Sequence, residues 1–168
     1  AFAGGKVVDA MTTHMDLFPT IMELLGLDPP DRLRGSSLLP LLRGDYPQQE
    51  TLHQAIFGEV TYHASYEPAR SVRTSRYKYI RRYDGRLQRV LCNVDNGPSK
   101  SYWMEHGWRD LAPPREALYD LAFDPNETGN LADDPEYGEV LDEMRILLER
   151  HLDETEDPIR AGYVLPPP

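Results

Sequence analysis

The first part of the chain carries apolar residues at intervals of three and four, which predicts a helix over residues 17–25. Asp16 is a suitable N-cap for this helix, and Gly26 is a suitable residue to end it. A shorter helix is expected over residues 37–42, while residues 45–51 are polar, contain a proline and favour a linker. The apolar face of the first helix comprises Leu17, Ile21, Leu24 and Leu25.

From residue 55 onward the pattern changes to a period of two, which is typical of β-strands. Asp84 and Gly85 suit a hairpin turn, and the apolar positions over residues 86–94 allow a further strand. The main strands are expected at residues 55–63, 69–74, 76–83 and 116–121. In the first of them, one face carries Ile56, Val60 and Tyr62, and the other carries Phe57, Glu59, Thr61 and His63.

The clearest helix lies near the end of the chain, over residues 135–154. Asp134 is placed to cap it and Pro135 suits its first position. Leu141, Met144, Leu148 and Leu152 recur at helical spacing. The sequence therefore predicts an α+β fold: a small antiparallel sheet with a long C-terminal helix, preceded by the tail of an α/β domain.

Charge changes this picture in one region. The 168-residue chain has a net charge of −10, which argues against general nucleic-acid binding. No apolar run approaches the ~20 residues needed to cross a bilayer. Residues 70–89 nevertheless hold eight lysines and arginines and a single acid, Asp84. This basic stretch is either a site for a specific anionic partner or a solvated strand face.

No complete catalytic or metal-binding constellation is visible in the sequence. The five histidines are scattered, with no pair at the spacing of metal ligands. Glu59 and His63 share a strand face, but four residues of strand span roughly 13 Å. Cys92 lies in the apolar run Val-Leu-Cys-Asn-Val, which predicts a buried and inert thiol.

Three stretches together resemble the C-terminal portion of a sulfatase of the alkaline phosphatase-like superfamily. They are THMDLFPTIMELLG at residues 13–26 with RGSSLLPLL soon after, EVTYH at 59–63 with PARSVRTSRYKYI at 68–80, and EALYDLAFDPNETGNLA at 116–132. They occur in the family's order over nearly the whole chain. The second stretch and the ending ETEDP most resemble the heparan N-sulfatase, or sulfamidase, branch.

The resemblance implies an enzyme that uses a formylglycine, made from a Cys or Ser in a C/S-x-P-x-R motif, beside a divalent cation, calcium by expectation. This chain contains no such motif, since Cys92 is followed by Asn-Val-Asp and Ser37 by Leu-Leu-Pro. The nucleophile and the metal ligands are therefore expected upstream. The segment alone is expected to hold no cofactor and to be inactive.

The resemblance also implies a substrate-facing edge in this segment, because the end of the first strand approaches the catalytic pocket in sulfatases. We expect Glu59, His63 and Arg70 to form it. Glu59 and His63 lie on the face opposite Ile56 and Val60, which we interpret as the non-core face. Arg70 suits a sulfate or carboxylate through paired hydrogen bonds. The alternative for Glu59 is an ion pair with one of the basic strands.

Three hypotheses follow. The chain is a sulfatase segment that shapes the substrate pocket, or a polyanion-binding module, or a non-catalytic dimerisation domain. Under the first, residues 1–45 form the C-terminal edge of the catalytic α/β domain and residues 46–168 form the sulfatase C-terminal domain. The expected partners are the upstream catalytic domain and a sulfated small molecule or saccharide. A homodimer is compatible with this hypothesis, and no nucleic-acid or membrane partner is expected.

Overall fold

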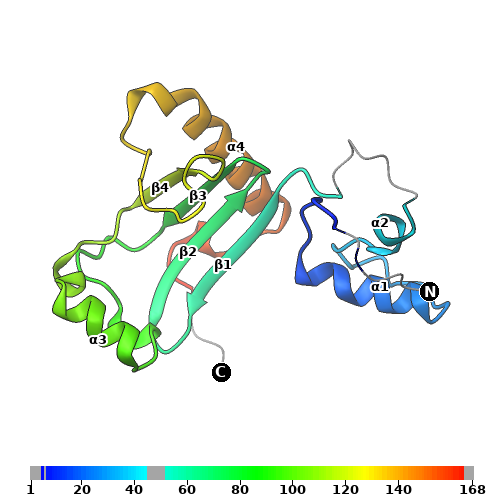
Figure 1. Ribbon diagram of the computed structural model, residues 1–168, viewed down its shortest axis with the longest axis horizontal. Coiled ribbons are helices and arrows are strands. Elements are labelled where there is room, and N and C mark those ends of the chain that lie inside the picture. Colours follow the sequence, from blue (N-terminus) through cyan, green and yellow to red (C-terminus); the bar gives the residue numbers. More distant parts are fainter. Residues whose placement is uncertain (1–4, 6, 45–51, 165–168) are drawn as a thin grey trace. The chain divides into compact units, whose positions relative to one another are not determined.

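The structure is a computed structural model that describes residues 5, 7–44 and 52–164. It consists of two compact units, residues 1–56 and residues 57–168 (Figure 1). The predicted linker at residues 45–51 lies outside the described residues.

The first unit contains a 3-10 turn, η1 (His14–Asp16), and two helices, α1 (Leu17–Leu24) and α2 (Leu39–Arg43). Both predicted helices are confirmed to within two residues. Gly26 follows α1 and Gly44 caps α2, with φ of 67° and 85°. These left-handed conformations suit glycine, which has no Cβ to clash, and they end each helix.

The apolar side chains of α1 face solvent in this chain. Residues of the predicted apolar face are between 51% and 68% exposed, whereas Pro19 and Thr20 on the other side are buried. Exposure of this many large apolar groups on one short helix is unusual for a finished domain surface. The exposed apolar residues of the helix and its C-terminal cap are Leu17, Phe18, Ile21, Leu24 and Leu25.

The second unit is built on a four-stranded sheet with the order β1-β2-β3-β4, in which neighbouring strands run antiparallel (Figure 1). Val72 pairs with Tyr79 and Tyr79 pairs with Leu118, so these three side chains form a buried row across the sheet. The predicted α+β fold is confirmed. The strands are β1 (Ile56–Tyr62), β2 (Tyr66–Arg73), β3 (Tyr77–Arg82) and β4 (Glu116–Asp120).

One long helix, α4 (Gly138–Glu154), covers the face of the sheet that carries this row and contacts β2 and β3 (Figure 1). The predicted apolar positions of α4 are all buried, and they supply the other half of the core. A 3-10 turn, η4 (Pro135–Tyr137), begins the element, and the Asp134 carboxylate accepts a hydrogen bond from the Glu136 N–H. The predicted capping role of Asp134 is thus confirmed.

The segment between β3 and β4 differs from the prediction. Residues 86–94 form no strand; a 3-10 turn, η2 (Leu91–Asn93), is followed by α3 (Pro98–Glu105) and a second 3-10 turn, η3 (Trp108–Asp110). The Asn93 side chain accepts a hydrogen bond from the Ser65 N–H and donates one to the Ser65 C=O, 28 positions away, and these bonds fix a turn where a strand was expected. Cys92 is exposed, so the prediction of a buried thiol was wrong.

Candidate functional site

The predicted site residue Arg70 lies at the centre of a buried polar cluster in the second unit. Its Nε and Nη2 donate to the two carboxylate oxygens of Asp157 at 2.6 and 3.0 Å. Asp157 follows α4 and caps the 3-10 turn η5 (Pro158–Ala161), where it accepts from the Ile159 N–H at 2.9 Å. Arg70 therefore fastens the segment after α4 to the middle of β2.

The remaining guanidinium nitrogen of Arg70 bonds to the neighbouring strands. Nη1 donates to the carbonyl of Val60 at 2.9 Å, to the Thr61 hydroxyl at 3.1 Å and to the carbonyl of Ala69 at 2.9 Å. The side chain of Arg70 is only 4% exposed. A guanidinium has five N–H donors, and protein groups engage all three of its nitrogens here.

Burial and ion pairing shift the pKa values of Arg70 and Asp157 in opposite directions. Burial by itself lowers the pKa of Arg70, but the hydrogen bonds and charge of Asp157, with the charge of Glu59, leave that pKa raised. Burial likewise raises the pKa of Asp157, and the bonds from Arg70 and from the Ile159 N–H bring it below its ordinary value. Both groups are therefore charged over the physiological range.

Glu59 is the exposed member of the cluster. Its Oε2 lies 3.7 Å from Arg70 Nε, and its side chain is 73% exposed. An exposed pair at this distance contributes little to stability. The Glu59 carboxylate therefore lies near Arg70 and remains open to a ligand.

The face on which Glu59 lies was predicted wrongly. The ring of Phe57, two residues earlier in β1, stacks on His151 of α4 with centroids 3.7 Å apart. Glu59 shares that face, so it projects from the helix-covered side of the sheet at its edge strand. Val60, assigned to the core face, is among the exposed large apolar residues.

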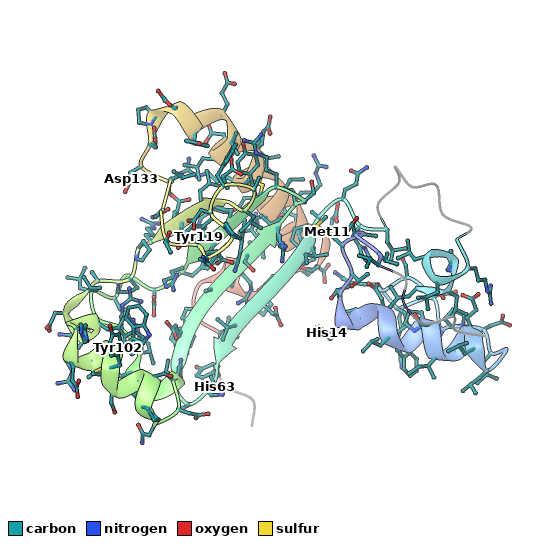
Figure 2. All side chains as sticks on the ribbon, in the orientation of Figure 1. Met11, His14, His63, Tyr102, Tyr119 and Asp133 are labelled. Carbon is teal, nitrogen blue, oxygen red and sulfur yellow. The ribbon has the colours of Figure 1, made fainter. Side chains whose placement is uncertain are left out.

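His63 lies directly after the end of β1, at the turn into β2 (Figure 2). Its backbone N–H donates to the Ser65 carbonyl at 3.3 Å. Its side chain is exposed, and within the described residues its imidazole makes no hydrogen bond. The structure thus brings Glu59 and Arg70 together and leaves His63 at the end of the same strand.

The hydrogen-bonding groups of this cluster that are not already used within the protein determine which ligand groups it can bind. Arg70 cannot offer two parallel donors to a sulfate unless its bonds to Asp157 break, because those donors are already used. Glu59 can accept hydrogen bonds from sugar hydroxyl or amide groups. A direct contact between Arg70 and substrate stays a prediction.

A second polar cluster, which the sequence analysis did not find, organises the first unit. The fully buried carboxylate of Asp16 accepts from the N–H groups of Thr13 and Ser36 at 2.8 and 2.9 Å. His53 Nε2 lies 2.9 Å from both of its oxygens. Burial alone raises the pKa of Asp16, and these bonds leave it lowered. We interpret this cluster as structural, since it joins three segments of the unit.

The described residues of the two units show neither a metal-binding cluster nor a membrane-spanning helix. Across residues 7–44 and 52–164, no group of three or more His, Cys, Asp and Glu side chains could hold a metal ion. None of the helices described there is long and apolar enough to span a bilayer.

Comparison with known proteins identifies the class. A hexuronate 2-O-sulfatase of Bacteroides thetaiotaomicron is 34% identical over 93% of this chain and 27% of its own length. The human N-sulphoglucosamine sulphohydrolase is 28% identical over 92% of this chain and 34% of its own length. A solved 2-O glycosaminoglycan sulfatase superposes with a TM-score of 0.63 at 33% identity, covering 91% of this chain and 27% of that protein.

These matches define the C-terminal portion of a sulfatase, as the sequence resemblance predicted. The family described as N-sulphoglucosamine sulphohydrolase, C-terminal, matches residues 1–112, and the chain belongs to this family. The chain spans about a third or less of the length of these relatives.

Proposed function

We propose that this chain is the C-terminal part of an enzyme that hydrolyses sulfate esters or N-sulfate groups of sulfated glycans. The observation that carries the proposal is membership of the sulphohydrolase C-terminal family. The names of two relatives add support, since one is a hexuronate 2-O-sulfatase and the other an N-sulphoglucosamine sulphohydrolase.

The catalytic machinery belongs, in this proposal, to the part of the enzyme upstream of Ala1. A formylglycine nucleophile and a divalent cation, calcium by expectation, would be held there. One observation supports this division: the chain has no C/S-x-P-x-R motif. Residues 1–45 would complete the catalytic domain, which agrees with the exposed apolar face of α1. Residues 46–168 would form the C-terminal domain.

The contribution of the C-terminal domain is a substrate-facing edge formed by Glu59, His63 and Arg70. Glu59 would accept hydrogen bonds from the saccharide, with His63 beside it at the end of β1. Arg70 would act as a positioning residue, since it is buried against Asp157 and lies 3.7 Å from Glu59. With this arrangement, the edge would contribute to binding of a saccharide and would not contribute to binding of a small substrate that does not reach it.

The activity is tested with the full-length protein, after mass spectrometry has verified the formylglycine. Sulfate release is measured with 2-O-sulfated unsaturated disaccharides, N-sulfoglucosamine and a small aryl sulfate. We expect turnover of at least one of the sulfated sugars by the full-length protein and none by the isolated 168-residue chain. Absence of sulfate release from every substrate by the formylglycine-containing protein would contradict the proposal.

A further inference from the structure

The loop between β1 and β2 consists of three residues, His63, Ala64 and Ser65. Hairpin loops of this length usually contain a residue with a positive φ, which reverses the chain within the loop itself. Among the described residues other than glycine, only Glu127 and Glu156 have a positive φ. The conformation of this loop therefore depends on bonds from other parts of the chain.

The side chain of Asn93, in η2 between β3 and β4, provides three such bonds. Its Oδ1 accepts a hydrogen bond from the Ser65 N–H at 2.8 Å, and its Nδ2 donates to the Ser65 carbonyl at 3.2 Å. Nδ2 also donates to Oε2 of Glu67, the second residue of β2, at 2.9 Å. An Asn amide has two donors and two lone pairs, and three of these four positions are bonded to this one hairpin. Asn93 therefore fixes the hairpin at the residue that ends its loop.

The chain is also fixed on the other side of His63. The Tyr62 hydroxyl donates to the Val164 carbonyl at 3.0 Å and lies 2.8 Å from the Tyr163 hydroxyl. The ring of Tyr66 lies 5.0 Å from the ring of Tyr62 and 4.8 Å from that of Tyr163, measured between centroids. Segments that are distant in sequence thus bind the residues before and after the loop.

Arg86 adds a bond to the second strand of the hairpin. Its Nη2 donates to the Tyr66 carbonyl at 2.8 Å, and its Nε donates to Asp84 at 2.6 Å. Arg86 belongs to the basic stretch at residues 70–89, in which five of the eight basic residues form salt bridges with acids of the second unit. These pairs support the interpretation of that stretch as an internally paired strand face.

The imidazole of His63 differs from the backbone around it. The side chain is exposed, and it makes no hydrogen bond within the described residues (Figure 2). An imidazole can donate to a sulfate oxygen or accept from a sugar hydroxyl. A binding residue on a fixed backbone loses less conformational freedom when it meets its ligand, so the bonds around the loop preorganise this contact.

We propose that Asn93 is a positioning residue for His63, through which the segment between β3 and β4 sets the affinity of the substrate-facing edge for a sulfated saccharide. The amide of Asn93 is already bonded to the hairpin, so it acts through the position of the loop and not by contact with substrate. The inference rests on the proposed function and deepens it, because it names the residue that orients one member of that edge.

The test is a double-mutant cycle in the full-length enzyme, with the KM measured for a 2-O-sulfated unsaturated disaccharide or N-sulfoglucosamine, whichever the enzyme hydrolyses. We expect His63→Ala to raise KM about ten-fold and Asn93→Ala to raise it about three- to ten-fold, since one hydrogen bond to a charged group is lost or misplaced. The double variant should match His63→Ala within about two-fold, because Asn93 has no further effect once the imidazole is gone. The kcat/KM for a small aryl sulfate should change less than about two-fold in each variant.

A compensating pair of substitutions separates the bonds of Asn93 from the bulk of its side chain. Asn93→Asp alone places a carboxylate beside Glu67 and should raise KM at least as much as Asn93→Ala. Asn93→Asp combined with Glu67→Gln exchanges donor and acceptor, so both the contact between these positions and the acceptor for the Ser65 N–H are restored. We expect KM to return to within about three-fold of the unsubstituted enzyme. Asn126→Ala, at an exposed position of the same unit, is the matched control and should leave KM unchanged.

A second measurement reads the position of His63 without turnover. The full-length protein is labelled with ¹³C at histidine Cε1, and the His63 ring signal is identified by its loss in His63→Ala. Asn93→Ala should shift or broaden this signal and leave those of His14 and His53, in the first unit, in place.

Three results would overturn the inference. Additive effects of the two alanine variants on KM would show that Asn93 acts independently of His63. A lowered melting temperature with unchanged KM in Asn93→Ala would mean that its role is purely structural. An unchanged His63 signal in that variant would show that Asn93 does not position the ring. Failure of the proposed function is distinguishable, because it would appear as absent sulfate release by the unsubstituted enzyme, whereas the NMR comparison does not depend on turnover.

Discussion

The guanidinium of Arg70 and the carboxylate of Asp157 form a two-point salt bridge between residues 87 positions apart in the sequence. The pair is buried, and it closes the C-terminal segment onto the second strand of the sheet. The net contribution of such a buried ion pair to stability is smaller than the stability lost when one partner is removed. Removal of one partner leaves the other charge unpaired and away from water.

We expect Arg70→Ala to lower the free energy of unfolding by about 3–5 kcal/mol, because Asp157 would lose its cation. Equilibrium urea unfolding at neutral pH measures the change. Arg73→Ala, on the same strand but exposed, is the control and should stay within about 0.5 kcal/mol. A cost for Arg70→Ala no larger than the control's would show that the salt bridge does not hold this segment in solution.

Glu59 allows a functional effect to be separated from a structural one. In the full-length enzyme, Glu59→Ala should raise KM for a sulfated saccharide about ten-fold and leave kcat on a small aryl sulfate unchanged, since one hydrogen bond to a charged group is lost. The melting temperature should not move, because the side chain is exposed. Glu143→Ala, an exposed acid on α4, is the control. Parallel losses on both substrates would argue for a folding role of Glu59 instead.

Acid should weaken the contact between β4 and α4. Glu116 accepts from Arg145 at 2.9 and 2.7 Å and from the Tyr79 hydroxyl, and the bonds from Arg145 are the main cause of a Glu116 pKa lowered to about 2. A carboxylate with a lowered folded-state pKa stabilises the fold above its unfolded-state value near 4.5, and this stabilisation is lost as the pH falls toward 2.

The free energy of unfolding should therefore decrease between pH 4.5 and pH 2, and part of this slope should vanish in Glu116→Gln. Chemical denaturation at several pH values provides the measurement. Glu143→Gln should keep the slope of the unsubstituted protein. An identical slope in Glu116→Gln would mean that Glu116 is not held by Arg145 in the folded state.

Two apolar residues of helix α4, one buried and one exposed, allow its packing on the sheet to be tested. Leu148 is 1% exposed and Ile146, two residues earlier, is 58% exposed. Leu148→Ala should cost about 2–5 kcal/mol through lost apolar burial and the cavity it leaves. Ile146→Ala should cost far less, so thermal unfolding of the two variants should differ by several degrees. Similar melting temperatures would contradict the packing of α4 on the sheet.

Periodicity in the sequence was enough to predict the main elements of the fold. Alternating positions around Glu59 and Tyr79 predicted β1 and β3, and the spacing of Leu141 to Leu152 predicted α4. These signals are strong because each element buries one face against the others, so packing and local pattern agree.

Interactions between distant residues were not predictable in the same way. The segment around Asn93 has the apolar positions of a strand, but its side chain bonds to Ser65 and fixes a turn. Asp16 was interpreted as a helix cap, whereas it is a buried acceptor for His53, 37 positions away. The wrong face for Glu59 has a related cause, since period two says which residues share a face but not which face the helix covers.

The exposed apolar side of α1 bears on how the enzyme is made. If α1 completes the upstream domain, as proposed, the ribosome synthesises every catalytic residue before it synthesises the helix that completes their domain. The proposed catalytic residues would then lie in an incompletely buried domain until this helix is synthesised, and such transiently exposed apolar surface favours aggregation. A stop codon placed just before Ala1 would leave the active-site residues intact in sequence and yet yield a protein that aggregates.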